Sequence, residues 1–363
     1  MTSVIAGTLG EIQFEKLLIM KEHEMKNIKT IFIGNYKGGV GKTTTVMSLA
    51  DYLISEGKNV YVFDLDPQAS LSTNLIKRDM KSGFQLNSKQ TLNYMITMIQ
   101  EYMRHKQISK FDLLEGESFL EDIRNLKSLP GHKNIDILTL KNVGAHAIKL
   151  VPTILSLKNE RLSDIMNRCE KDPNSLFIIP LLMEYLGITE SKIETDTYVL
   201  FDCPPASNKI MHSVFLYSDY YLIPTIGDDL SSDGVLHYLS EINDIQSKYS
   251  FDSNVGGLLL DSYFGKHPNL IGVIETLYKN SAGQHRTTNS LMAMESALND
   301  NGIRSILSKK EYERMRREGM KHIFDIFVKH EVKLVENLNK RIISTEYTQI
   351  FEKVKTLIEE DIA

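Results

Sequence analysis

The 363-residue sequence has little cysteine and no long hydrophobic run, and each absence excludes a class of protein. Only Cys169 and Cys203 are present, far apart in sequence. A disulfide scaffold and a multi-cysteine metal site within one chain are therefore excluded, and a reducing compartment is favoured. No apolar stretch approaches the roughly 20 residues that cross a bilayer. The first 26 residues lack a basic segment before an apolar core, so we predict no secretion signal and a cytoplasmic location.

An excess of positive charge is also absent. Lysine and arginine number 42 against 47 acidic residues, for a formal net charge of −5. A globally basic nucleic-acid coat is excluded, although a local basic patch is not. Hydrophobic residues make up 42% and charged residues 25%, the balance of a globular protein with a large core. The length suits one large α/β domain with an insertion, or two domains.

The pattern of a strand, a glycine-rich loop, a helix and a second strand opens the folded region. Residues 30–34 form a short β-branched run, which is typical of a buried strand. Residues 44–55 place apolar side chains on one helical face, and Gly57 follows as a helix end. Residues 60–63 are the next buried strand, which closes on Asp64. This order predicts a parallel sheet.

The remaining elements predict an α/β fold with a mostly parallel sheet flanked by helices. Further strands are expected at residues 135–138, 198–201, 220–223, 255–260 and 323–327. Further helices are expected at residues 91–103, 145–157, 160–169, 176–186, 232–247, 270–281, 288–299 and 347–360. We interpret residues 1–27 as an N-terminal extension, with a short helix near residues 11–20. Residues 28–363 form the main domain, with an α-rich insertion at about residues 79–195.

The segment from Lys37 to Thr44 predicts a phosphate-binding loop. It reads Lys-Gly-Gly-Val-Gly-Lys-Thr-Thr and lies between a predicted strand and a predicted helix, the context that such a loop requires. Glycines let successive backbone N–H groups turn toward one anion, and the helix N-terminus adds partial positive charge. Lys42 is expected to neutralise the β- and γ-phosphates, and the Thr43 hydroxyl to ligate Mg²⁺.

Three aspartates follow predicted strands. Asp64, Asp66 and Asp202 are expected at the carboxyl edge of the parallel sheet, where the phosphate loop also lies. Phosphoryl transfer needs positioned charges and an oriented water, which such carboxylates supply. The alternative for any one aspartate at a strand end is a helix cap.

The loop departs from the general G-x-x-x-x-G-K-[ST] pattern at its start. Tyr36 stands where the first glycine is expected, and Lys37 adds a second lysine. Lys37 comes too early in the loop to wrap around its own γ-phosphate. It is better placed to reach a nucleotide bound by another subunit, and the alternative is a solvated lysine.

Three segments together resemble the ParA/Soj/MinD group of P-loop ATPases with a deviant Walker A motif. They are the loop at residues 37–44, Asp-Leu-Asp-Pro-Gln at residues 64–68, and Phe-Asp-Cys-Pro-Pro at residues 201–205. The resemblance covers roughly residues 28–78 and 196–363, and the insertion matches poorly. It implies a P-loop ATPase domain that uses ATP and Mg²⁺.

The resemblance assigns roles to the loop residues. Lys37 resembles the signature lysine that crosses an ATP-sandwiched homodimer to the partner's phosphates. Lys42 is implied as the ordinary P-loop lysine. The nucleotide-binding residues implied are Gly38, Gly39, Val40, Gly41, Lys42, Thr43 and Thr44.

The resemblance also assigns roles to the three aspartates. Asp66 resembles the carboxylate that orients the attacking water. Asp202 would hold Mg²⁺ through water, and Asp64 would support the Mg²⁺ shell beside Thr43.

A local basic segment lies near the C-terminal end. Between Arg304 and Lys321 are seven basic and three acidic residues. On a helix, four of the basic residues would form one continuous stripe: Lys310, Arg314, Arg317 and Lys321. Such a stripe suits the DNA phosphate backbone without reading bases. The alternative is a solvated helix face with internal ion pairs.

The resemblance implies a ParA-type partition ATPase. ATP would drive dimerisation and non-specific binding to nucleoid DNA, and a ParB-like partner would stimulate hydrolysis. The alternative is a MinD-like or other positioning ATPase acting on a membrane or a protein scaffold. The acidic end of residues 351–363 disfavours a membrane. A synthetase or a metal-cluster carrier of the same superfamily is a third option.

Overall fold

The structure is a computed structural model, and it places most of the main domain. It describes residues 27–108, 117–126, 137–155, 160–189, 193–227, 234–237, 240, 244, 263–264, 268–277, 289–329 and 334–362. The helix expected near residues 11–20 and the strand expected at residues 255–260 lie outside the described residues. Of the helix expected at residues 232–247, only residues 234–237, 240 and 244 are described, and they are helical.

The described residues form a seven-stranded sheet in the order β3-β4-β2-β5-β1-β6-β7. Every neighbouring pair is parallel except β3 and β4, which are antiparallel. The strands are β1 (Ile28–Ile33), β2 (Asn59–Asp64), β3 (Leu138–Val143), β4 (His146–Val151), β5 (Thr197–Asp202), β6 (Tyr220–Thr225) and β7 (Asn269–Glu275). The predicted fold class, a mostly parallel sheet of the P-loop type flanked by helices, is confirmed.

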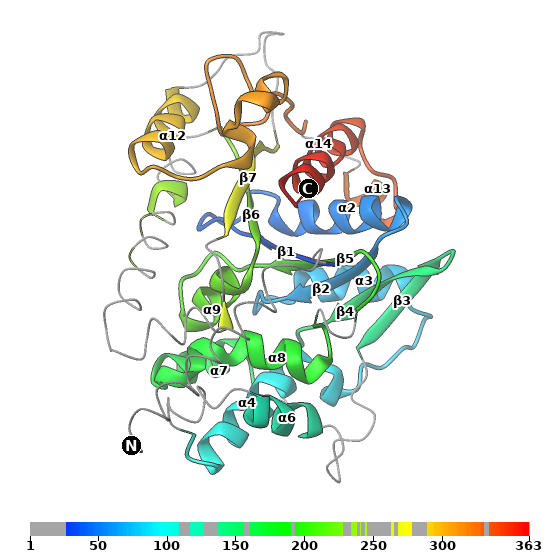
Figure 1. The fold of residues 1–363 in the computed structure, drawn as a ribbon. Coiled ribbons are helices and arrows are strands. Elements are labelled where there is room, and N and C mark those ends of the chain that lie inside the picture. Colours follow the sequence, from blue (N-terminus) through cyan, green and yellow to red (C-terminus); the bar gives the residue numbers. More distant parts are fainter. Residues whose placement is uncertain are drawn as a thin grey trace, which may run out of the picture.

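Helices cover both faces of this sheet (Figure 1). Side chains alternate across each strand, so Ile31 and Ile33 of β1 pack on one face and Phe32 on the other. The first face carries α2 (Lys42–Ser55), α3 (Ser70–Asp79), α13 (Leu334–Asn339) and α14 (Thr345–Ile362). The second carries α4 (Leu92–His105), α6 (Glu117–Asn125), α7 (Leu162–Glu170), α8 (Ile178–Leu186), α9 (Lys209–Tyr217) and α12 (Asn289–Asp300).

Most of the second layer comes from the stretch between α3 and β5, which the sequence indicates as an α-rich insertion. It supplies α4, α6, α7 and α8, and also β3 and β4, the two strands at one end of the sheet. The helix predicted at residues 145–157 is wrong, because residues 146–151 form β4. Ile148 and Leu150 are buried while Lys149 between them is half-buried, which is the period of two of a strand. Pro152 also opposes a helix there.

The helix predicted at residues 270–281 is wrong as well. Residues 269–275 form β7, parallel to β6. Its β-branched run is packed from one side by Phe324, whose ring lies 2.6 Å from where a Cβ on Gly272 would stand. The strand predicted at residues 323–327 is reduced to isolated bridges, from Ile323 to Val273 and from Phe324 to Arg316.

The C-terminal helix α14 packs its apolar face against the helix that follows the phosphate loop. Tyr347, Phe351 and Leu357 are buried in the same cluster as α2. The Tyr347 hydroxyl and the Thr45 hydroxyl of α2 share a hydrogen bond of 2.9 Å. No helix among the described residues is long and apolar enough to cross a membrane.

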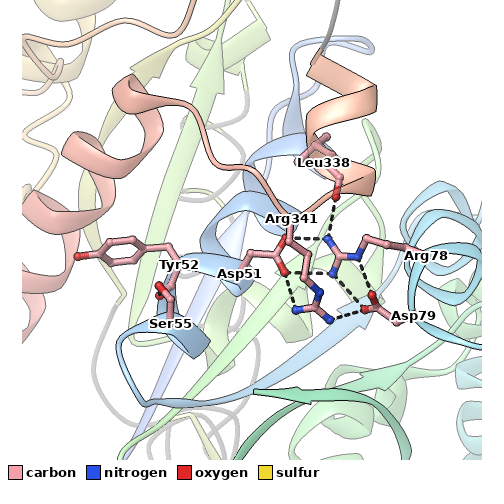
Figure 2. A network of polar contacts seen from close by, with 7 residues as sticks. All are labelled: Asp51, Tyr52, Ser55, Arg78, Asp79, Leu338 and Arg341. Atoms are coloured by element: carbon pink, nitrogen blue, oxygen red, sulfur yellow. Dashed lines mark hydrogen bonds and ion pairs between the residues drawn. The ribbon is translucent and has the colours of Figure 1, made fainter. Parts of the chain in front are cut away.

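A buried ionic network joins α2, α3 and the segment after α13 (Figure 2). The Arg78 guanidinium contacts Asp51 of α2 at 2.6 Å and Asp79 at 2.9 Å. Arg341 contacts the same two carboxylates at 3.1 and 2.8 Å. Arg78 also donates to the Leu338 carbonyl at 3.2 Å. Two positive and two negative charges thus fix the C-terminal end of α3, the helix that follows Asp66.

Candidate functional site

The predicted phosphate loop lies between β1 and α2, as expected from the sequence. Gly39 and Gly41 have φ of +75° and +81°, a region that other residues rarely adopt. Gly41 is the N-cap of α2. The loop therefore has the backbone that an anion-binding turn at a helix N-terminus requires.

The Lys42 ammonium is folded back over the loop. Its Nζ donates to the carbonyls of Asn35 at 3.0 Å and Lys37 at 2.7 Å. Burial lowers the pKa of Lys42, while Asp202 and Asp66 act in the opposite direction and favour its charged form. The Lys42 ammonium thus lies against the first residues of the loop, near the carboxylates of Asp202 and Asp66.

Two side chains to which the sequence analysis assigned no role attach the loop to neighbouring strands. The buried Asn35 amide donates to the Pro224 carbonyl at the end of β6, at 2.9 Å, and its oxygen accepts from the Lys37 N–H at 3.0 Å. Thr276, directly after β7, places its hydroxyl 2.7 Å from the Val40 carbonyl. The sequence analysis missed Thr276 because it predicted a helix at residues 270–281. Only the end of a strand brings Thr276 to the carboxyl edge of the sheet, where the phosphate loop lies.

Thr43 and Asp202 meet as predicted. The Thr43 hydroxyl donates to Asp202 Oδ2 at 2.8 Å. Asp202 is fully buried at the end of β5. Burial raises its pKa well above the ordinary value, nearby Asp64 adds to the increase, and the Thr43 hydrogen bond opposes it. A cation placed beside this carboxylate would favour its ionised form.

Asp64 forms hydrogen bonds with the first turn of α3. The end of β2 lies beside the end of β5, with Asp64 opposite Asp202. Its Oδ2 accepts from the Ser72 N–H at 2.8 Å and the Ser72 hydroxyl at 2.6 Å, in the first turn of α3. Its Oδ1 accepts from the Asp66 N–H at 3.2 Å. Burial raises the pKa of Asp64 to about 6, although the Ser72 bonds act against the rise. Asp64 therefore binds the first turn of α3 without being its N-cap, which is Ala69, and support of a Mg²⁺ shell by Asp64 stays a prediction.

Asp66 and Lys37 are half-buried on the loops beside this edge. Asp66 Oδ1 accepts from the Gln68 N–H at 2.8 Å, which leads the chain into α3. The position of Asp66 is close enough to raise the pKa of Lys42. Their predicted roles, orienting water and reaching a second subunit, stay predictions.

The oxygen donors at this edge fit magnesium. Mg²⁺ prefers oxygen ligands and is usually bound through one or two protein groups together with substrate phosphates and water. Thr43 and Asp202 offer such a pair. Within the described ranges, no group of three or more His, Cys, Asp or Glu residues could hold a metal without that help. Cys203 is buried and its pKa is raised by burial, so it is an inert thiol beside the site.

The basic segment differs from its predicted form. The continuous helical stripe is wrong, because the short helix η5 (Lys310–Met315) is broken at Tyr312 and Arg316 is extended. Lys310, Arg314 and Lys321 are exposed. Arg317 instead points inward and pairs with Glu275 at 2.7 Å. Whether any of these four residues contacts DNA stays a prediction.

Comparisons with known proteins identify the family and the fold of the chain. The family model described as "AAA domain" matches residues 28–255. The chromosome-partitioning ATPase Soj of Treponema pallidum is 23% identical over 235 residues, covering 65% of this chain and 72% of that protein. A variant of McdA from Cyanothece in complex with ATP has a TM-score of 0.58 at 17% identity, covering 92% of this chain and 97% of that one.

A second solved structure, pNOB8 ParA bound to nonspecific DNA, has a TM-score of 0.50 at 19% identity and covers 92% of this chain and 99% of that one. At such identities the likeness of the solved structures concerns the fold. The match of the family model spans more than half of the chain, from β1 through β6. The chain therefore belongs to the AAA domain family, as a member of the ParA/Soj type of P-loop protein that its loop resembles.

Proposed function

We propose that this protein is a ParA-like partition ATPase, cytoplasmic and associated with the nucleoid. Mg·ATP binds at the loop of residues 37–44, two chains close on the nucleotides, and the closed dimer holds DNA without reading its sequence. Hydrolysis, stimulated by a ParB-like partner, reopens the dimer. Mg²⁺ supplies charge neutralisation at the phosphates when it is bound.

One observation carries the proposal. A single sheet edge brings Lys42, Thr43 and Asp202 together around a glycine loop, with Asp66 on the next loop. This constellation suits phosphoryl transfer to water, because it offers positioned cations, a metal-binding pair and a carboxylate that can orient a nucleophile. The relatives named Soj and ParA support the partition role, and the nonspecific DNA complex of pNOB8 ParA supports DNA as the partner.

Co-sedimentation tests the proposal against its alternative. The protein, with Mg·ATP, with Mg·ADP or with no nucleotide, is spun with DNA or with anionic liposomes. We expect ATP-dependent recovery with DNA. Recovery with liposomes alone would instead favour a membrane-positioning ATPase. The structure argues against that outcome, because the apolar face of α14 is already buried against α2 and is not available to insert into lipid.

We predict that Lys37→Ala abolishes ATP-dependent dimerisation while nucleotide still binds. Lys37 precedes the loop's glycines, and its contribution is expected at the other subunit's phosphates. Size-exclusion chromatography with and without ATP measures the dimer, and calorimetry measures binding of ATP. A variant that still forms the ATP-dependent dimer would refute the role assigned to Lys37.

We predict that Lys310→Ala combined with Arg314→Ala weakens binding to all DNA sequences alike. Both side chains are exposed, and the slope of log affinity against log salt falls by about 0.9 for each DNA phosphate that the protein no longer neutralises. Filter-binding titrations across salt concentrations measure the slope. Arg104→Ala is the matched control, since Arg104 is an exposed arginine on α4. Equal slopes in the double variant and the control would make the basic segment a solvated surface.

A further inference from the structure

The half-buried position of Arg317 distinguishes it from the exposed Lys310, Arg314 and Lys321 of the same segment. Its side chain is 14% exposed and pairs at 2.7 Å with Glu275, whose side chain is 3% exposed. A buried carboxylate without its partner is left uncompensated, which is costly. The Arg317 side chain is therefore held in its ion pair with Glu275, whereas Lys310 and Arg314 are exposed to solvent.

The turn that begins at Arg317 is bound to β7 through the residues that follow it. The Arg317 N–H donates to the Ile323 carbonyl at 3.1 Å, which closes a turn over residues 317–323. The Val273 N–H then donates to the His322 carbonyl at 2.8 Å, and the Phe324 N–H to the Val273 carbonyl at 3.1 Å. The turn is anchored on its other side by Glu295 of α12, which accepts from the N–H groups of Lys321 and His322 at 2.7 and 3.1 Å.

The residue after Glu275 contacts the phosphate loop directly. The Thr276 N–H donates to the Thr225 carbonyl at 2.7 Å, and the Thr276 hydroxyl lies 2.7 Å from the Val40 carbonyl and 2.9 Å from the Thr225 carbonyl. A Cβ on Gly41 would stand 3.5 Å from the same hydroxyl. In a trans peptide the carbonyl and the next N–H point to opposite sides. Holding the Val40 carbonyl toward Thr276 therefore turns the Gly41 N–H away from Thr276.

We infer that Arg317 is a positioning residue, which connects the basic segment to the phosphate loop through Glu275 and Thr276. This inference deepens the proposed function. It rests on that function only for the binding of DNA to the basic segment. Arg317 contributes no phosphate contact. It fixes Glu275, and Glu275 fixes the adjacent Thr276, so that the Val40–Gly41 peptide keeps the orientation that nucleotide binding needs. Coupling between two sites is reciprocal. If DNA binding moves the basic segment, the affinity for nucleotide therefore changes, and nucleotide binding changes the affinity for DNA by the same factor.

The test compares Arg317→Met with Arg314→Met. Calorimetry measures Mg·ATP affinity, and filter binding measures the salt slope with a short DNA duplex. For Arg317→Met we expect ATP affinity to fall by about 5- to 150-fold, the usual range for coupled sites, with the salt slope unchanged. For Arg314→Met we expect the slope to fall by about 0.9. The control Arg104→Met, at an exposed arginine on α4, is expected to change neither quantity.

A double-variant cycle with Thr276→Val tests the connection itself. The valine keeps the shape of threonine and removes the hydroxyl, so we expect weaker ATP binding that does not add to the effect of Arg317→Met. Should Arg317→Met fail to fold, Arg317→Met with Glu275→Met replaces the pair by apolar side chains, which buried pairs often tolerate, and the same readouts apply.

The inference would be overturned by a salt slope in Arg317→Met that falls as in Arg314→Met. It would also be overturned by decreases in ATP affinity from Arg317→Met and Thr276→Val that add in full. An ATP affinity within twofold of the parent in Arg317→Met would overturn it too. If the unaltered protein binds no DNA, the proposed function fails, and the ATP measurements with the Thr276 cycle still decide the inference.

Discussion

Lys42→Met is expected to weaken the binding of Mg·ATP strongly. The methionine retains much of the volume of the lysine but removes the ammonium that now donates to the carbonyls of Asn35 and Lys37. A nucleotide would then bring its phosphate charge into the loop without the buried Lys42 ammonium to neutralise it. Truncating one partner of a buried charge pair costs about 2–5 kcal/mol, or roughly 30- to 5,000-fold in affinity. Calorimetric titration with Mg·ATP measures the decrease.

Lys37→Ala provides the contrast for this variant, because it removes a second lysine from the same loop. We expect it to bind Mg·ATP as a monomer, so the difference between the two variants isolates the role of Lys42. Circular dichroism on Lys42→Met is needed alongside, since the Asn35 and Lys37 carbonyls lose a donor. A folded Lys42→Met protein with unchanged ATP affinity would show that the loop is not a nucleotide site.

The loop and the strand ends could be predicted from sequence because local patterns determine them. A β-branched run followed by glycines and an amphipathic helix leaves few alternatives, and β1, the loop and α2 follow it closely. Parallel strands share one carboxyl edge, so Asp202 lies beside Thr43 as expected. The partner of each carboxylate could not be predicted. Asp64 is bonded to Ser72, eight residues later, and no periodic pattern specifies that contact.

Short apolar runs account for the failures of the sequence analysis. Residues 270–274 and 146–151 fit either a buried helix or a strand, and only their neighbours in the sheet decide between them. The basic stripe failed for a related reason. Spacing alone cannot show that Gly319 has a φ of +75° and turns the chain, or that Glu275 on another element binds Arg317. Such long-range pairs depend on tertiary structure, which the spacing of charges does not contain.

Arg78→Met is expected to destabilise the fold by about 3–5 kcal/mol, the usual cost of removing one partner from a buried ion pair. The Arg78 side chain is 2% exposed and is shared between Asp51 and Asp79 (Figure 2). Its removal leaves two buried carboxylates with the single guanidinium of Arg341. Arg341→Met should cost less, because that side chain is 21% exposed and water can replace part of it. Urea denaturation midpoints measure both variants, with Arg104→Met, 72% exposed, as the control.

The dependence on pH separates the effect of charge pairing from that of packing. Burial already raises the pKa of Asp51, and Arg78 is the largest influence that opposes the rise. Without Arg78 the folded-state pKa rises further above the unfolded value, so the folded variant binds more protons than the unfolded chain. Stability then falls as pH increases through that range and recovers as pH decreases. The deficit of Arg78→Met relative to the parent should therefore shrink as the solution is acidified and the Asp51 carboxyl, whose pKa is raised by burial, takes up its proton. A deficit that is constant with pH would mean that Arg78 stabilises α3 against α2 through its aliphatic stem alone.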